Sequence, residues 1–129
     1  MIGAGAIIEN NTLIRSFTKI LTGAYICADT EIGSNCFIGP RVVMLNDRYL
    51  GHNNIPKEVR AEQRKGPTLR SNVYVGGNST LLPGVTLNRG VVIGAGSLVS
   101  KDLLVKGVYY NKDCVAVWQG KEIGIKASG

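Results

Sequence analysis

The sequence predicts a parallel β-helix, a solenoid of short strands, because an apolar residue recurs at every sixth position and turn residues fill the intervals. Stepping by six from the second residue gives the unbroken apolar series Ile2, Ile8, Ile14, Ile20, Ile26, Ile32, Ile38 and Met44. Four residues after the first seven of these stand small or β-branched residues, namely Ala6, Thr12, Thr18, Ala24, Thr30, Cys36 and Val42. An amphipathic α-helix would need apolar residues at intervals near 3.6 instead.

A period of six has a direct physical meaning. A short strand alternates its side chains in and out, and two turn residues then bend the chain, so three hexads close one triangular coil. One large aliphatic residue per hexad fills the interior, and a small residue fits beside it near the corner. No coil buries its interior alone, so stability comes from stacking of coils and from covered ends.

The register breaks once and resumes. The first block of hexads covers residues 2–44 and the second covers residues 69–105, where the apolar series is Val75, Leu81, Leu87, Ile93, Val99 and Val105. Residues 45–68 fit no hexad and are expected to form an inserted loop, and residues 106–129 are expected to close the C-terminal end. A loop this long inside a compact solenoid is usually functional. We expect one domain over residues 1–129.

Composition and charge limit the class of protein. No apolar run approaches the roughly 18–20 residues of a membrane span, and the N-terminus lacks a basic signal region, so a cytoplasmic protein is expected. Cys27, Cys36 and Cys114 match no zinc-binding spacing, and Cys36 falls where the repeat places a small inward residue. The net charge of +6 suits an anionic ligand such as a nucleotide or coenzyme A, or serves solubility alone.

Several stretches carry a family resemblance. Residues 38–49, Ile-Gly-Pro-Arg-Val-Val-Met-Leu-Asn-Asp-Arg-Tyr, resemble the I-G-P-x-V-x-F-x-N-D-R-Y segment of bacterial N-acetyltransferases that act on nucleotide-linked 3-amino sugars. Residues 75–85 and 93–102 are similar to general stretches of the hexapeptide-repeat acyltransferases, and residues 120–124 resemble the ending of the same N-acetyltransferases. The chain departs from the pattern at residues 115–120, where Val-Ala-Val-Trp-Gln-Gly replaces the usual Gly-Asn-Pro-Ala segment.

The resemblance implies a left-handed winding for the β-helix, although general chirality rules favour right-handed crossovers. It also implies acetyl-coenzyme A as co-substrate, a UDP- or dTDP-linked amino sugar as acceptor, and a homotrimer with each site between two subunits. We therefore expect acetyl transfer to the amine of a nucleotide-linked amino sugar. Sugar O-acetylation is the alternative, followed by a non-catalytic β-helix that serves as a scaffold or binding protein.

The chemistry of the acceptor favours an amine. A sugar hydroxyl stays protonated at neutral pH and needs a positioned base, whereas an amine with a pKa near 7.7–8.0 is already partly neutral. The resemblance makes Asn46 the partner that positions this amine, although an Asn here could also simply form the turn. Asp47 could accept a proton or hold the ammonium form, or it could pair with Arg48. His52 is either a base or a solvated loop residue.

The remaining site residues are expected on the loop and in the second block. Arg48 and Tyr49 are expected to bind substrate. The resemblance implies a backbone amide at Gly76 or Gly77 for the oxyanion, although glycine at a corner already has a conformational reason. It places Ala95, Ser97 and Lys101 along the coenzyme, with Lys101 either meeting a phosphate or merely exposed.

Two other classes are less compatible with the sequence. A carbonic anhydrase of the same prism shape needs three histidine ligands for its metal, and the chain has His52 alone, so no metal is expected. The basic residues are not interleaved with stacking aromatic residues in the sequence, so no nucleic-acid partner is expected.

Overall fold

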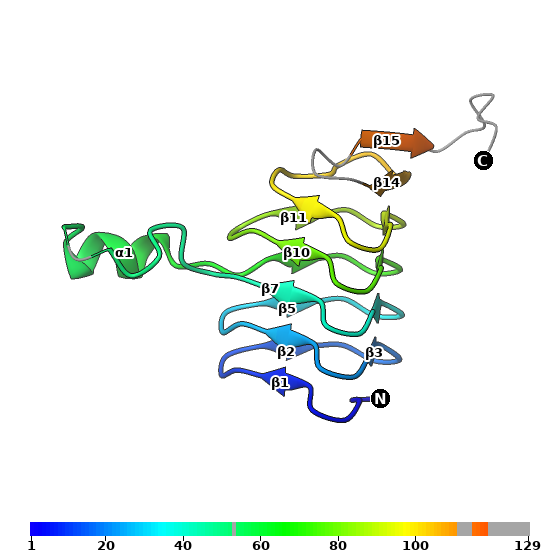
Figure 1. Ribbon diagram of the computed structural model, residues 1–129, viewed down its shortest axis with the longest axis horizontal. Helices are drawn as coiled ribbons and strands as arrows, with labels where there is room; N and C mark the ends of the chain where they lie inside the picture. Colours follow the sequence, from blue (N-terminus) through cyan, green and yellow to red (C-terminus); the bar gives the residue numbers. More distant parts are fainter. Residues whose placement is uncertain (53, 111–114, 119–129) are drawn as a thin grey trace.

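The chain forms a left-handed parallel β-helix, seen side-on in Figure 1, which confirms the predicted fold class. The computed structural model describes residues 1–52 and 54–110, together with the backbone of residues 115–118. The expected closing segment 106–129 therefore lies partly outside the described residues. Within the described part, no helix is both long and apolar enough to span a bilayer.

Three parallel sheets form the walls of a triangular prism. Strands 18 residues apart are neighbours, as in the pairing of Ile8 with Ile26 and of Ile14 with Ile32, so three hexads make one coil. The first wall contains β1 (Ile7–Ile8), β4 (Tyr25–Ile26), β7 (Val43–Met44), β10 (Thr80–Leu81) and β13 (Leu98–Val99). The second contains β2 (Leu13–Ile14), β5 (Glu31–Ile32), β8 (Thr68–Leu69) and β11 (Thr86–Leu87). The third contains β3 (Lys19–Ile20), β6 (Phe37–Ile38), β9 (Tyr74–Val75), β12 (Val92–Ile93), β14 (Val108–Tyr110) and the antiparallel β15 (Val115–Trp118).

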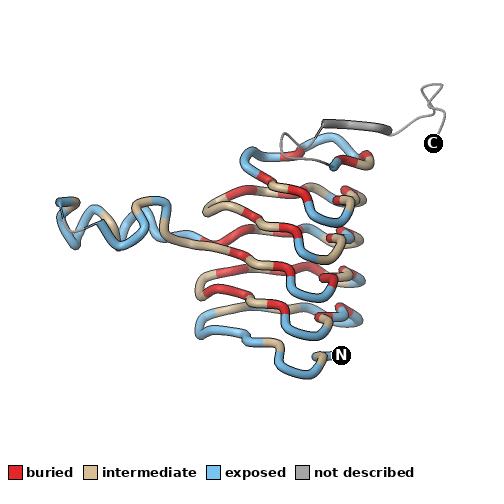
Figure 2. Tube along the Cα trace, viewed as in Figure 1, coloured by how far each residue is buried: buried red, intermediate tan, exposed pale blue. Residues whose placement is uncertain are grey.

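The inward residues form the core that the period of six predicts. Ile20, Ile26, Ile32, Ile38 and Met44 are fully buried, and Cys36 is buried beside them at 2% exposure. Figure 2 shows this burial repeating along every coil of the middle of the prism. At about 25 cal/mol per Å² of buried apolar surface, each such side chain contributes roughly 1.5–3 kcal/mol to folding.

The corners use residues that tolerate a positive φ. Asn11, Asp29, Asn35, Asn72 and Asn78 all adopt φ between +54° and +65°, and these residue types visit that region most readily after glycine. Phe17 adopts a φ of +64° as well, although the residue is 81% exposed, so its corner gains no core packing in return.

The two ends of the prism differ from the sequence expectation. At the N-terminal end Ile2 and Ile8 are 52% and 37% exposed, because no coil lies beneath them. At the other end Val105 is 52% exposed, so its predicted inward place was wrong, and Leu103 is buried instead, in a bridge to Leu87. The physical reason is a shorter last coil: Ile93 pairs with Tyr109, 16 residues on, whereas Val75 pairs with Ile93, 18 residues on.

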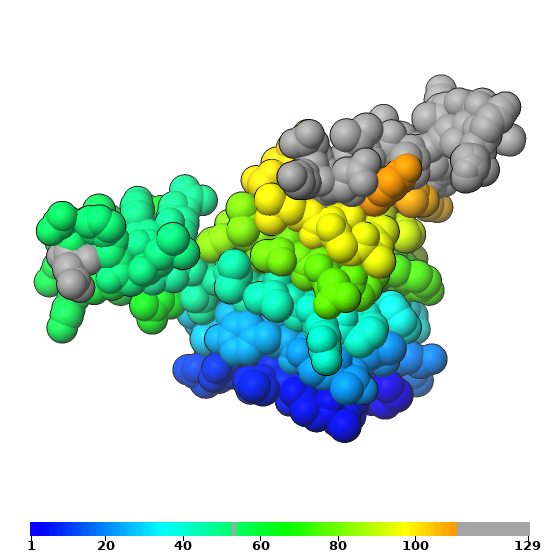
Figure 3. All heavy atoms as spheres, viewed as in Figure 1, coloured from blue at the N-terminus to red at the C-terminus, as the bar shows by residue number. Residues whose placement is uncertain are grey.

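The inserted segment projects sideways from one corner, clear of the prism (Figures 1 and 3). It leaves after β7 and returns at Thr68, which already belongs to β8 although the sequence had placed it in the loop. The segment contains a helix that the sequence analysis did not foresee, α1 (Lys57–Gln63), which has no buried residue.

Candidate functional site

The corners of successive coils stack into three columns that run along the prism axis. The loop corner joins the first wall to the second and contains Asn10–Asn11, Ala28–Asp29, the base of the inserted loop, Pro83–Gly84 and Lys101–Asp102. The glycine corner joins the third wall to the first and contains Ala4–Gly5, Thr22–Gly23, Pro40–Arg41, Gly77–Asn78 and Ala95–Gly96. The third corner joins the second wall to the third and contains Ser16–Phe17, Ser34–Asn35, Ser71–Asn72 and Arg89–Gly90.

Asn46 stands where the loop leaves the loop corner, and its side chain is fixed there. Its Nδ2 donates to the carbonyl oxygen of Ala28 at 3.0 Å, and its own carbonyl accepts the Lys65 N–H at 3.1 Å. Gly66 closes the base of the loop by donating to the Asp29 carbonyl at 3.1 Å. With Nδ2 held by Ala28, the Oδ1 atom of Asn46 is oriented away from that bond and can accept a hydrogen bond from a ligand.

Asp47 stabilises the first turn of the loop. Its two carboxylate oxygens accept the backbone N–H groups of Tyr49 at 2.9 Å and Gly51 at 2.8 Å. The bond from Tyr49 is the main cause that lowers the pKa of Asp47, with Gly51 and the nearby Arg64 acting in the same direction. A carboxylate whose charged form is stabilised in this way is a weak base.

Within the described part of the chain, the other loop residues named from the sequence form no hydrogen bond with Asn46. His52 is exposed, and its Nδ1 accepts the Asn54 N–H at 3.1 Å, a local contact within the loop. Arg48 is exposed and Tyr49 half-buried. Among the described residues the ion pair found is Arg15 with Glu31, so the alternative pairing of Asp47 with Arg48 is not seen.

At the glycine corner the structure distinguishes between the two expected oxyanion donors. The Gly76 N–H donates to the Ile93 carbonyl at 2.7 Å and is therefore occupied. The Gly77 N–H, one residue further, has no acceptor among the described residues. Ala95 stands at the equivalent place one coil later, and its N–H likewise has no acceptor within the described part. Two backbone donors on successive coils, roughly 4.8 Å apart, are thus without an acceptor within the described part.

A glycine lies against each of these two donors. A Cβ on Gly39 would lie 2.6 Å from the Gly77 nitrogen, and a Cβ on Gly76 would lie 2.5 Å from the Ala95 nitrogen. Gly76 is thus not the donor that the sequence suggested but the residue that leaves the Ala95 N–H uncovered. Gly39 was not among the predicted site residues, although it belongs to the Ile-Gly-Pro start of the segment that carries the family resemblance.

Two coenzyme residues expected from the sequence lie elsewhere. Ser97 is 2% exposed, and its hydroxyl donates to the Gly94 carbonyl at 2.6 Å, so its side chain belongs to the interior and is not retained in the candidate site. Lys101 is exposed at the loop corner, one strand beyond the corner that contains Ala95. Cys27 and Cys36 are buried, and burial raises the pKa of both thiols, as expected for core residues.

Within one chain, Asn46 at the loop corner is far from the Gly77 and Ala95 N–H groups at the glycine corner. From Arg41 at the glycine corner to Asn46 at the loop corner the chain runs five extended residues, about 16 Å at 3.3 Å per residue. One reacting carbonyl cannot contact both Asn46 and the Gly77 N–H of the same chain. The wall between these corners has a largely apolar outer surface, which includes Ile7, Tyr25, Val43, Leu82 and Leu98 beside the polar Glu9 and Thr80.

Comparison with known proteins gives a consistent family. Residues 11–46 and 66–101 match the family described as bacterial transferase hexapeptide (six repeats). The galactoside O-acetyltransferase of Escherichia coli is 37% identical over 73 residues, which cover 56% of this chain and 35% of that protein. The bifunctional protein GlmU of Acinetobacter baumannii is 25% identical over 124 residues, covering 84% of this chain and 27% of that protein. The chain thus spans about a quarter of the length of the GlmU proteins it matches.

Solved structures share the fold. A maltose O-acetyltransferase from Clostridium difficile superposes with a TM-score of 0.61 at 24% identity, covering 94% of this chain and 70% of that one. PerB from Caulobacter crescentus, solved with coenzyme A and GDP-perosamine, superposes with a TM-score of 0.59 at 20% identity, covering 93% and 58%. At these identities the likeness establishes the β-helix and not the substrate.

Proposed function

The chain belongs to the bacterial hexapeptide transferase family, and from that premise we propose that it transfers an acetyl group from acetyl-coenzyme A to the amine of a nucleotide-linked amino sugar. The observation that carries the proposal is the pair of uncovered N–H groups of Gly77 and Ala95, on successive coils of one corner. Such a pair suits the two functions that a thioester needs: one donor for the oxyanion and one for an amide carbonyl of the pantetheine arm.

In the proposed reaction the neutral amine attacks the thioester carbonyl carbon. The C–N bond forms, the C–S bond breaks, and the proton lost from nitrogen goes to the departing thiolate, directly or through solvent. The Gly77 N–H stabilises the oxyanion, and Asn46 Oδ1 accepts an amine N–H and directs the nitrogen lone pair at the carbon. No strong base is required, which agrees with the lowered pKa of Asp47 and the local hydrogen bond of His52.

The separation of the two corners supports a site shared between copies. We propose a homotrimer in which the glycine corner of one copy faces the loop corner of the next, with the apolar outer surface of β1, β4, β7, β10 and β13 turned inward. In this arrangement Lys101 of the neighbouring copy approaches the coenzyme on the glycine corner, and Arg48 and Tyr49 of that neighbour approach the acceptor. The molecular mass in solution, measured by light scattering, tests the trimer.

Sugar O-acetylation is the second candidate, because the names of two relatives specify O-acetyltransferases. A hydroxyl acceptor would need a base, and His52 would then have to turn from its loop contact toward the acceptor. Release of coenzyme A, followed with a thiol reagent, distinguishes the two. The acceptors are UDP- and dTDP-linked 3-amino sugars and GDP-perosamine, each beside its hydroxy counterpart.

Release with amines alone supports the proposal and identifies the nucleotide. Release with hydroxyl acceptors contradicts amine specificity. If no acceptor causes release and acetyl-coenzyme A produces no thermal shift, the chain is a β-helix with a binding or scaffold function instead.

A further inference from the structure

The third corner takes no part in the site proposed above. It stands between the second and third walls, opposite the apolar wall that separates the loop corner from the glycine corner. A ligand at this corner would compete neither with acetyl-coenzyme A at Gly77 nor with an acceptor at Asn46. The residues that gather here combine an exposed aromatic ring with several cations.

The first feature is a hollow beside Tyr74. It measures about 480 Å³, within the range of small-molecule sites, and is lined by Asn72, Tyr74, Arg89, Gly90, Val92 and Lys106. Tyr74 is 48% exposed, and its ring is supported from one side by Phe37, with ring centroids 6.4 Å apart and planes inclined by 50°. Tyr74 thus offers a supported aromatic face, and the nearby Asn72 offers an amide.

The second feature is a basic groove that continues from this hollow onto the second wall. The groove measures about 610 Å³, and Arg89 and Lys106 line both it and the hollow, so the two are contiguous. Arg70 adds a third cation next to them. The aliphatic part of the Lys106 side chain packs over Gly90. A Cβ at residue 90 would lie 3.0 Å from the Lys106 Cγ, so the glycine leaves room for this side chain to cross the corner.

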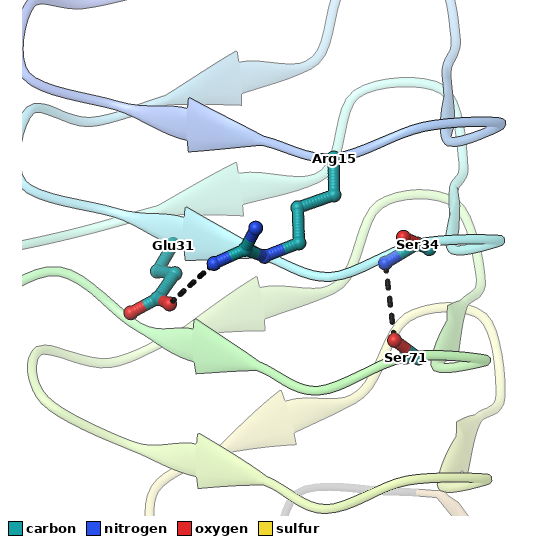
Figure 4. Close-up of polar contacts among 4 residues, drawn as sticks. All are labelled: Arg15, Glu31, Ser34 and Ser71. Carbon is teal, nitrogen blue, oxygen red and sulfur yellow. Dashed lines mark hydrogen bonds and ion pairs between the residues drawn. The ribbon is translucent and has the colours of Figure 1, made fainter.

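The groove is not uniformly basic. Its far end contains Glu31, whose carboxylate forms an exposed ion pair with Arg15 at 3.9 Å, as Figure 4 shows. The positive charge is therefore concentrated at Arg70, Arg89 and Lys106, next to the aromatic hollow. The corner beneath Arg70 is fixed by the Ser34 N–H, which donates to the Ser71 Oγ at 3.2 Å and ties two coils together (Figure 4).

We propose that the third corner binds a nucleoside di- or triphosphate, with the base stacked on Tyr74 and the phosphates held by Arg89, Lys106 and Arg70. Guanidinium groups match phosphate oxygens in a bidentate geometry, and aromatic faces stack on any base. The Glu31 carboxylate disfavours a polyanion that would run the whole length of the groove. A single nucleotide fits the short cationic end, whereas a nucleic-acid strand does not.

Calorimetric titration of the full chain with ADP, GDP and inorganic tripolyphosphate tests this site. We expect both nucleotides to bind, and Arg89→Ala to weaken them at least tenfold. Tyr74→Leu should weaken the nucleotides but not tripolyphosphate, and Tyr74→Phe should restore them, since it keeps the ring. Lys57→Ala, which removes one positive charge from α1, is the charge-matched control and should bind as the wild type does.

The same titration separates this site from the transferase site. Asn46→Ala should keep full nucleotide affinity at the third corner, and Arg89→Ala should keep acetyl transfer. The proposal would be overturned if both Arg89→Ala and Tyr74→Leu bound nucleotides as tightly as the wild type does. It would also be overturned if Tyr74→Leu changed the affinity for nucleotides and for tripolyphosphate by the same factor. Absence of nucleotide binding in the wild type would overturn it as well, and would leave the proposed acetyl transfer untouched.

Discussion

Gly39 lies directly beneath Gly77 at the glycine corner, so close that a Cβ on Gly39 would stand 2.6 Å from the Gly77 nitrogen. The hydrogen atom in place of a side chain at residue 39 leaves the Gly77 N–H uncovered. The same relation recurs one coil later between Gly76 and Ala95, at 2.5 Å. A glycine beneath a corner N–H also occurs at the third corner, where a Cβ on Gly33 would lie 2.7 Å from the Ser71 nitrogen, and at the glycine corner this relation gives the first prediction.

Gly39→Ala should lower kcat for acetyl transfer by about 10²–10³-fold, the range seen when one oxyanion donor is lost. The coenzyme should still bind, because the Ala95 donor is unaffected, and a thermal shift with acetyl-coenzyme A measures this. Gly33→Ala is the matched control, since its Cβ would lie 2.7 Å from the Ser71 nitrogen at the third corner, away from the site. If both variants lost stability and activity alike, the effect of Gly39 would be packing alone.

Asn46→Ala should reduce turnover by about 10–100-fold while coenzyme affinity stays nearly constant, because positioning of the amine is lost and not the coenzyme corner. The variant should also lose about 1 kcal/mol of stability with the bond to Ala28. Asn88→Ala removes a comparable bond, from Nδ2 to the Leu104 carbonyl at 3.0 Å, and serves as control for stability alone. Steady-state kinetics with wild-type turnover in Asn46→Ala would remove Asn46 from the mechanism.

The scaffold could be read from the sequence, because a period of six in apolar residues has few structural solutions. The registers of Ile8 with Ile26 and of Ile14 with Ile32 follow from it directly. The shortened last coil could not be foreseen, since Leu103 and Val105 are equally apolar and only the coil geometry chooses between them. The resemblance implied a backbone donor at Gly76 or Gly77, but the choice between them could not be made from the sequence, because it depends on which N–H the neighbouring coil leaves unpaired.

The pH dependence of the loop follows from Asp47. Its pKa is lowered in the folded state, so its contribution to loop stability is fully present above the unfolded value, near 3.9, and is lost as the pH falls through the folded value. Protease cleavage within residues 47–64 should therefore accelerate as the pH drops below about 4. The measurement is limited proteolysis with an acid-active protease across this range.

Two variants of Asp47 separate a structural role from a catalytic one. Asp47→Asn keeps an oxygen that can accept the Tyr49 N–H, so it should retain most of the activity at neutral pH and remove the pH dependence of cleavage. Asp47→Ala removes both acceptors and should loosen the loop at every pH. A large loss of kcat in Asp47→Asn with an intact loop would instead make the carboxylate a base.

The uncovered N-terminal end predicts that equal truncations of two inward isoleucines, one at this end and one between coils, cost unequal stability. Ile32→Ala should destabilise the fold by about 2–5 kcal/mol, because the side chain is fully buried between coils and leaves a cavity. Ile8→Ala should cost less than half of that, since Ile8 is already 37% exposed and no coil lies beneath it to enclose a cavity. Urea unfolding followed by circular dichroism measures both, at equal protein concentration. Equal losses of stability would mean that the N-terminal end is covered in solution, most simply by another copy of the chain. Only a covered Ile8 could leave a cavity as costly as that of Ile32.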